Sequence, residues 1–140
     1  MKIFTSNLLK FTAIIIVTTS LFRLTLSSFL ANKLIIPTIF LAIFYGLLMF
    51  FFGWYFGKKD YEYLPIFDLG LRYNTITFVI FCGISELWFL LKLNAPYEHV
   101  RGLRITELIW LIILIIHLII YLIYRKRHSF KGLDKTEIFE

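Results

Sequence analysis

Four ionisable side chains stand inside long apolar stretches of this chain, and they are the residues best placed to do chemistry: Arg23, Glu86, Glu107 and His117. A charged group at the centre of a hydrocarbon layer costs roughly 2.5–3.5 kcal/mol on insertion scales. Each of these residues therefore needs a partner or a polar cavity. Groups of this kind mark ion pathways, proton relays or contacts that fix the register of two helices.

Arg23 and Glu86 are predicted to pair with each other. If two spans running in the same direction cover 11–31 and 73–93, both side chains lie slightly beyond the span centres. At about 1.5 Å per helical residue, they are then within a few ångströms of the same depth. An arginine and a carboxylate at matching depth are natural partners in a low dielectric. The pair could fix helix register alone, or it could serve as a charged gate or proton-linked site.

The other two candidates lie in the last apolar run. Glu107 stands near its start, where an acid suits the helix dipole and can reach lipid headgroups. His117 lies near its middle, where a histidine could relay protons or simply hydrogen-bond a neighbouring helix. The three histidines are scattered and Cys82 is the single cysteine, so metal-ligand spacing is absent. No metal, no cofactor and no catalytic residue is predicted.

The composition excludes a soluble domain. Of the 140 residues, 59% are hydrophobic and 17% charged, against about 45–50% and about 25% in soluble domains. The net charge is +6, but the basic residues flank the apolar runs, as topology signals and headgroup contacts do. Arg125, Lys126 and Arg127 are predicted to meet lipid headgroups. A nucleic-acid partner is not predicted, because the basic residues form no single water-facing surface.

Four apolar runs predict an all-α membrane protein, a bundle of four transmembrane helices in one domain over 1–140. The spans are expected at about 11–31, 34–56, 73–93 and 105–124, with a short basic tail at 125–140. The first run could instead open a signal peptide, but no cleavage pattern follows, so a retained helix is predicted. Ten lysine and arginine residues fall on one side of such a bundle and four on the other. This asymmetry predicts cytoplasmic termini, in a multi-pass protein of a bacterial inner (plasma) membrane.

The second run carries a stripe of small residues at spacings of four, seven and four: Ala42, Gly46, Gly53 and Gly57. Small residues four apart on a helix let another backbone approach closely. The stripe is expected to pack inside the bundle, with self-association through the same face as the alternative.

These observations favour a non-enzymatic protein that acts by association, as an accessory subunit or a self-assembling membrane component. Its expected partners are the lipid bilayer and either itself or another membrane protein. The alternative is a small oligomeric transporter or channel with an intramembrane Arg23/Glu86 site. A membrane enzyme acting on a lipid-linked substrate is the third hypothesis.

Overall fold

The chain forms four helices in the computed structural model, which describes the backbone of residues 5–60 and 66–133 and the side chains of 5–60, 69–124 and 126. The helices are α1 (Ser6–Ala31), α2 (Ile35–Asp60), α3 (Ile66–Leu90) and α4 (Val100–Leu133). Each contains a stretch long and apolar enough to cross a membrane. The predicted all-α class with four apolar helices is therefore confirmed, and it indicates a multi-pass integral membrane protein.

The helices extend beyond several of the predicted spans. α1 begins early because Thr5 caps it, its hydroxyl accepting a hydrogen bond from the backbone N–H of Leu8 at 3.1 Å. α3 begins at Ile66 instead of about 73, which shortens the predicted linker before it. α4 continues to Leu133 instead of ending at about 124. The basic residues after 124 are good helix formers, and no glycine or proline interrupts them before Gly132.

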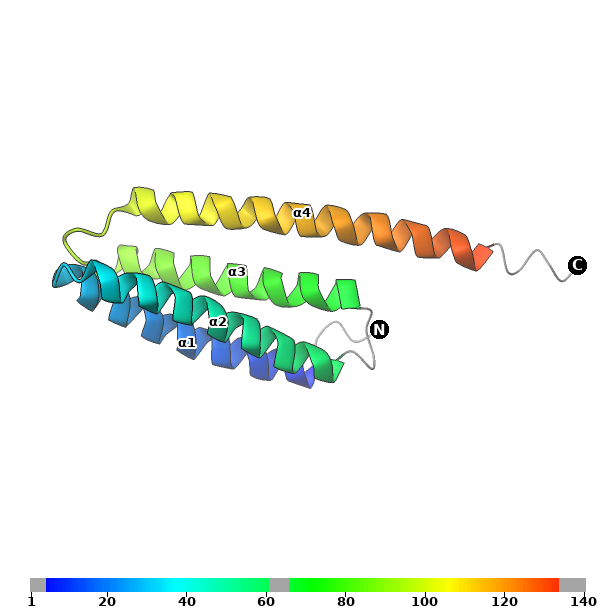
Figure 1. The fold of residues 1–140 in the computed structure, drawn as a ribbon, viewed down its shortest axis with the longest axis horizontal. Helices are drawn as coiled ribbons and strands as arrows, with labels where there is room; N and C mark the ends of the chain where they lie inside the picture. Colours follow the sequence, from blue (N-terminus) through cyan, green and yellow to red (C-terminus); the bar gives the residue numbers. More distant parts are fainter. Residues whose placement is uncertain (1–4, 61–65, 134–140) are drawn as a thin grey trace, which may run out of the picture.

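Two helix ends share one type of turn. Lys33 after α1 and Lys92 after α3 have positive φ angles of 57° and 56°. The N–H of the residue after each lysine bonds to a carbonyl five positions earlier, at 2.9 and 3.0 Å. This pattern satisfies carbonyls that the helix end would otherwise leave unpaired. Because α1 and α3 run in the same direction (Figure 1), the two lysines lie at the same end of the bundle, called here the Lys33 end.

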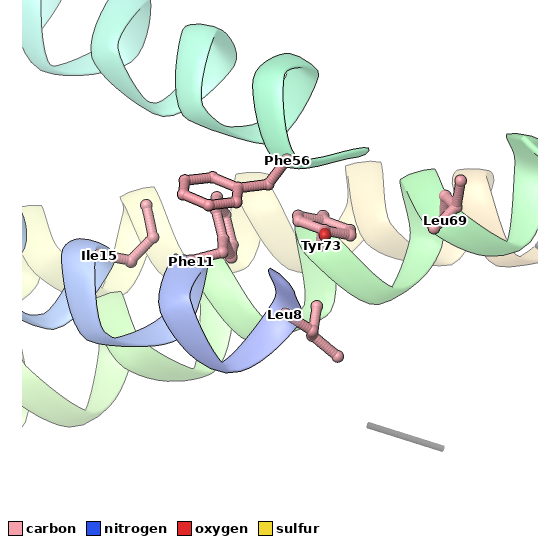
Figure 2. Packing of buried hydrophobic residues seen from close by; sticks show 6 residues of the cluster. All are labelled: Leu8, Phe11, Ile15, Phe56, Leu69 and Tyr73. Carbon is pink, nitrogen blue, oxygen red and sulfur yellow. The ribbon is translucent and has the colours of Figure 1, made fainter. Parts of the chain in front are cut away.

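Helices α1, α2 and α3 pack together around an apolar cluster near the opposite end, called here the Asp60 end. Figure 2 shows side chains of this cluster on all three helices, with Phe11, Phe56 and Tyr73 close together. The rings of Phe11 and Tyr73 lie 4.7 Å apart between centroids, and Phe11 meets Phe56 edge-on at 6.1 Å. The cluster consists of Leu8, Phe11, Ile15, Phe56, Leu69 and Tyr73.

Helix α4 is set apart from the other three. Within the described residues, α3 is the helix whose backbone it approaches closely, and Figure 1 shows it lying along α3 and extending past the bundle toward the C-terminus. Leu103 is the one buried residue between Val100 and Tyr124 of α4. The fold is thus a three-helix unit with a fourth helix attached along one side.

Candidate functional site

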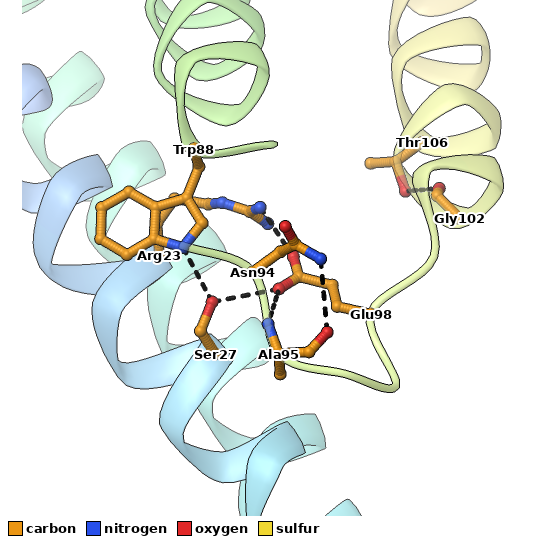
Figure 3. A network of polar contacts seen from close by, with 8 residues as sticks. All are labelled: Arg23, Ser27, Trp88, Asn94, Ala95, Glu98, Gly102 and Thr106. Atoms are coloured by element: carbon orange, nitrogen blue, oxygen red, sulfur yellow. Dashed lines mark hydrogen bonds and ion pairs between the residues drawn. The ribbon is translucent and has the colours of Figure 1, made fainter. Parts of the chain in front are cut away.

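The most deeply buried ion pair among the described residues joins α1 to the loop between α3 and α4. Arg23 Nη2 lies 2.6 Å from Glu98 Oε1, and the two side chains are 4% and 8% exposed. The other carboxylate oxygen, Oε2, accepts hydrogen bonds from the Ser27 hydroxyl at 3.0 Å and from the Ala95 N–H at 3.3 Å. Trp88 Nε1 donates to the same hydroxyl at 2.9 Å, as Figure 3 shows. Glu98 thus holds the loop onto two helices.

The predicted pairing of Arg23 with Glu86 is wrong. Arg23 binds Glu98, and its guanidinium carbon lies 5.4 Å from the centre of the Phe89 ring. On α3 the face toward α1 carries Trp88 and Phe89, whereas Glu86 points along the seam with α4. Adjacent helical positions point about 100° apart, so matching depth did not place the carboxylate on the matching face.

Glu86 and Glu107 are brought together by an arginine. Arg104 Nη1 lies 2.5 Å from Glu86 Oε1 and 3.1 Å from Glu107 Oε2. The Arg104 and Glu86 side chains are 60% and 43% exposed, so this group lies at the surface of the seam. Two carboxylates on one guanidinium make a contact between α3 and α4 that keeps a net negative charge.

A buried carboxylate that the sequence reading passed over lies at the other end of the bundle. Asp60 is 2% exposed and accepts hydrogen bonds from Thr5 at 2.5 Å, Asn7 at 2.8 Å and Tyr73 at 2.9 Å. Its partners come from the start of α1 and from α3, so one side chain ties three helices together. Asp60 follows two lysines, a pattern typical of the end of a membrane span, yet it lies four residues after the buried Phe56 on the same helical face.

A hollow lies between α2, α3 and α4, toward the Asp60 end. It has a volume of about 730 Å³ and is lined by Met49, Gly53, Trp54 and Gly57 of α2, Gly70 and Tyr73 of α3, and Trp110 and His117 of α4, among others. It exists because α4 approaches α3 without closing on α2. The groove is called here the α2–α4 cavity.

His117 is part of the wall of this cavity. A Cβ built on Gly70 would lie 3.2 Å from both Cε1 and Nε2 of His117, so the imidazole rests directly on the glycine. His117 lies far along α4 from the Arg104 group, which is at the start of that helix. The four residues singled out in the sequence therefore do not converge on one site.

The predicted packing of the small stripe inside the bundle is wrong. A Cβ placed on Gly46, Gly53 or Gly57 would meet nothing within 4 Å, and Ala42 is exposed. Gly53 and Gly57 instead form part of the cavity wall, while Ala42 and Gly46 face outward nearer the Lys33 end. Of the three basic residues predicted at headgroups, Lys126 is exposed. The side chains of Arg125 and Arg127 lie outside the described residues.

The chemistry available at these sites is that of binding and packing. Within the described residues, no group of three histidine, cysteine or acidic side chains could hold a metal ion. The Arg23–Glu98 pair and the Asp60 cluster join side chains of different elements, which suits positioning of helices, while Arg23 Nε has no hydrogen-bond partner within the described residues. Compared with protein-family models, curated proteins and solved structures, the chain finds no match.

Proposed function

We propose that this protein acts without catalysing a reaction, by associating side by side with a second copy of itself in the membrane through α2. The observation that carries the proposal is the outward-facing pair Ala42 and Gly46. It forms a small-xxx-small step on a helix whose apolar stretch is almost entirely unburied in one chain. Steps of this type are typical of helix–helix contacts in membranes, where close backbone approach replaces the hydrophobic effect.

The side chains around this step suit contact with another helix. Ile39, Ile43 and Leu47 flank it at helical spacing, and all three are more than half exposed. Large side chains beside a small-residue step pack against the backbone of the approaching helix. A second copy supplies the same surface, so the contact is self-complementary about a two-fold axis.

The transporter hypothesis has less support from the packing. The polar groups around Asp60 at one end and around Arg23 at the other are separated by the apolar cluster that contains Phe11 and Ile15, both fully buried. A polar pathway inside the three-helix unit would have to cross that layer. The enzyme hypothesis requires ionisable side chains that meet at one point. Glu86 and Glu107 instead lie on a surface seam away from His117.

The test replaces Gly46 with leucine and measures the oligomeric state in lipid bilayers by counting photobleaching steps of labelled protein. Gly46→Leu is expected to weaken the dimer by a factor on the order of ten, which corresponds to about 1.4 kcal/mol. Gly83→Leu is the matched control. It is also a helical glycine with nothing within 4 Å of a built Cβ, but it lies on α3.

The wild-type chain should show two bleaching steps at protein-to-lipid ratios where Gly46→Leu shows one. A monomeric wild type at every ratio would contradict the proposal. So would equal weakening by Gly46→Leu and Gly83→Leu, because the effect would then not belong to α2.

A further inference from the structure

The α2–α4 cavity has the size and position of a binding site for one lipid chain. Its volume of about 730 Å³ lies within the roughly 300–1,000 Å³ typical of ligand pockets. It runs along α2 from Met49 to Lys58, which is about 14 Å at 1.5 Å per residue. That length is about half of a 30 Å hydrocarbon layer. The cavity is therefore about as long as one leaflet is deep.

The polar atoms around the cavity are largely engaged by the protein itself. Asn74 Oδ1 accepts from Trp110 Nε1 at 3.1 Å, and the Thr77 hydroxyl donates to the Tyr73 carbonyl at 2.9 Å. The Tyr73 hydroxyl donates to Asp60 at 2.9 Å. The surface that lines the cavity consists chiefly of carbon atoms, together with the glycine backbones of α2 and α3. A wall of this kind suits a hydrocarbon chain and not a polar solute.

A single cation stands at one end of the cavity among its described lining residues. This cation is Lys58, which is exposed and lies within one turn of the end of α2. Its Nζ is 5.7 Å from the centre of the Trp54 ring. No carboxylate in the described part of the chain forms an ion pair with it. The neighbouring Lys59 is engaged differently, donating to the Tyr55 hydroxyl at 2.9 Å. Lys58 is thus available to a negative group at headgroup depth.

We infer that the α2–α4 cavity binds one acyl chain of an anionic phospholipid from the surrounding bilayer, with the lipid phosphate at Lys58. The bilayer supplies this ligand directly, and the charge of Lys58 selects an anionic headgroup over a zwitterionic one. The glycines at 53, 57 and 70 keep the walls thin enough for the chain to enter from the side. The inference does not rest on the proposed dimer, whose contact lies around Ala42 and Gly46.

The test measures which lipids the full-length protein retains. The protein is released from nanodiscs containing equal amounts of phosphatidylglycerol and phosphatidylcholine, and its bound lipids are counted by native mass spectrometry. The wild type is expected to retain one phosphatidylglycerol preferentially. Lys58→Gln should lower that preference about fivefold, the factor expected for one cation at the membrane surface.

Matched variants separate the cavity from general surface attraction. Lys59→Gln removes the same charge one residue away and should leave the preference unchanged. Gly57→Leu places a side chain in the cavity and should abolish retention of both lipids, with Gly53→Leu as a second cavity variant and Gly83→Leu as the inert control. Circular dichroism confirms that each variant is helical.

Equal losses in Lys58→Gln and Lys59→Gln would overturn the inference, because the attraction would then belong to the surface. Undiminished lipid retention in both Gly53→Leu and Gly57→Leu would overturn it too. A wild type that retains no lipid and whose dimer is broken by Gly57→Leu would show that a second copy fills the cavity instead. Photobleaching of Gly46→Leu tests the dimer separately, so the two proposals can fail independently.

Discussion

Arg23 and Glu98 are both less than one-tenth exposed, whereas the Arg104–Glu86 pair is largely open to its surroundings. Removing one member of a buried pair leaves an uncompensated charge in a low dielectric, which typically costs about 3–5 kcal/mol. Arg104 and Glu86 lie at a half-open surface, where a pair contributes about 0–1 kcal/mol. From burial alone, the Arg23–Glu98 pair is therefore expected to affect stability more than the Arg104–Glu86 pair.

Glu98→Gln is expected to lower the free energy of unfolding by about 3–5 kcal/mol, because the Arg23 charge loses its counter-ion. The measurement is reversible unfolding in mixed detergent micelles. Glu86→Gln serves as the control and should cost about 1 kcal/mol or less. A larger loss in Glu86→Gln than in Glu98→Gln would mean that Arg23 is paired with Glu86 after all.

At the scale of the helices, α3 and α4 are in contact where the His117 imidazole lies against Gly70. A Cβ at Gly70 would lie 3.2 Å from the His117 ring, which is tighter than ordinary van der Waals contact. The same seam is joined at its other end by Arg104 with Glu86 and Glu107. The two contacts lie near opposite ends of α3, so together they set the line along which α4 is attached.

Gly70→Ala is expected to be less stable than Gly83→Ala by about 1 kcal/mol, because its Cβ forces the His117 ring a few tenths of an ångström away from α3. Thermal or denaturant unfolding measures the change. Gly83→Ala, with no atom near its built Cβ, should be neutral or slightly stabilising. Adding His117→Ala to Gly70→Ala should recover most of the loss. Failure of that second change to recover stability would locate the strain elsewhere.

The helices and the buried face of α1 could be predicted from spacing. Thr19, Arg23 and Ser27 share one side at steps of four, and all three are buried. Spacing does not say which helix that side meets, and for this reason the partner of Arg23 was misassigned. Glu98 lies in a loop, where no periodicity reveals direction. Asp60 lies beyond the expected span at 34–56 and follows two lysines, which hides its place on the buried face of α2.

The molecule as a whole divides into a tightly joined α1–α3 unit and a loosely attached α4. Polar side chains bind the unit at both ends, through Asp60 and through Glu98, with the apolar cluster between them. By contrast, α4 meets the backbone of α3 alone among the described residues and buries little of its apolar stretch. Local stability should therefore be lowest in α4.

Pulling the chain out of a bilayer from its C-terminus is expected to release α4 in a separate step at low force, before α1–α3 leave together. The reason is that α4 buries little of its apolar stretch, whereas Asp60 joins the other three helices through hydrogen bonds. Single-molecule force spectroscopy records these steps. Extraction of all four helices in a single event would contradict the division.

The tie between Arg23 and Glu98 also has a consequence for synthesis on the ribosome. In a nascent chain the first hydrophobic helix carries its guanidinium long before the loop that neutralises it has been translated. At about 5–20 residues per second, that interval lasts on the order of ten seconds. During this time the insertion machinery or the interfacial water has to accommodate the unneutralised arginine. Ribosome-stalled chains ending before residue 98 should accordingly hold this helix less securely in the bilayer than chains that extend well past it.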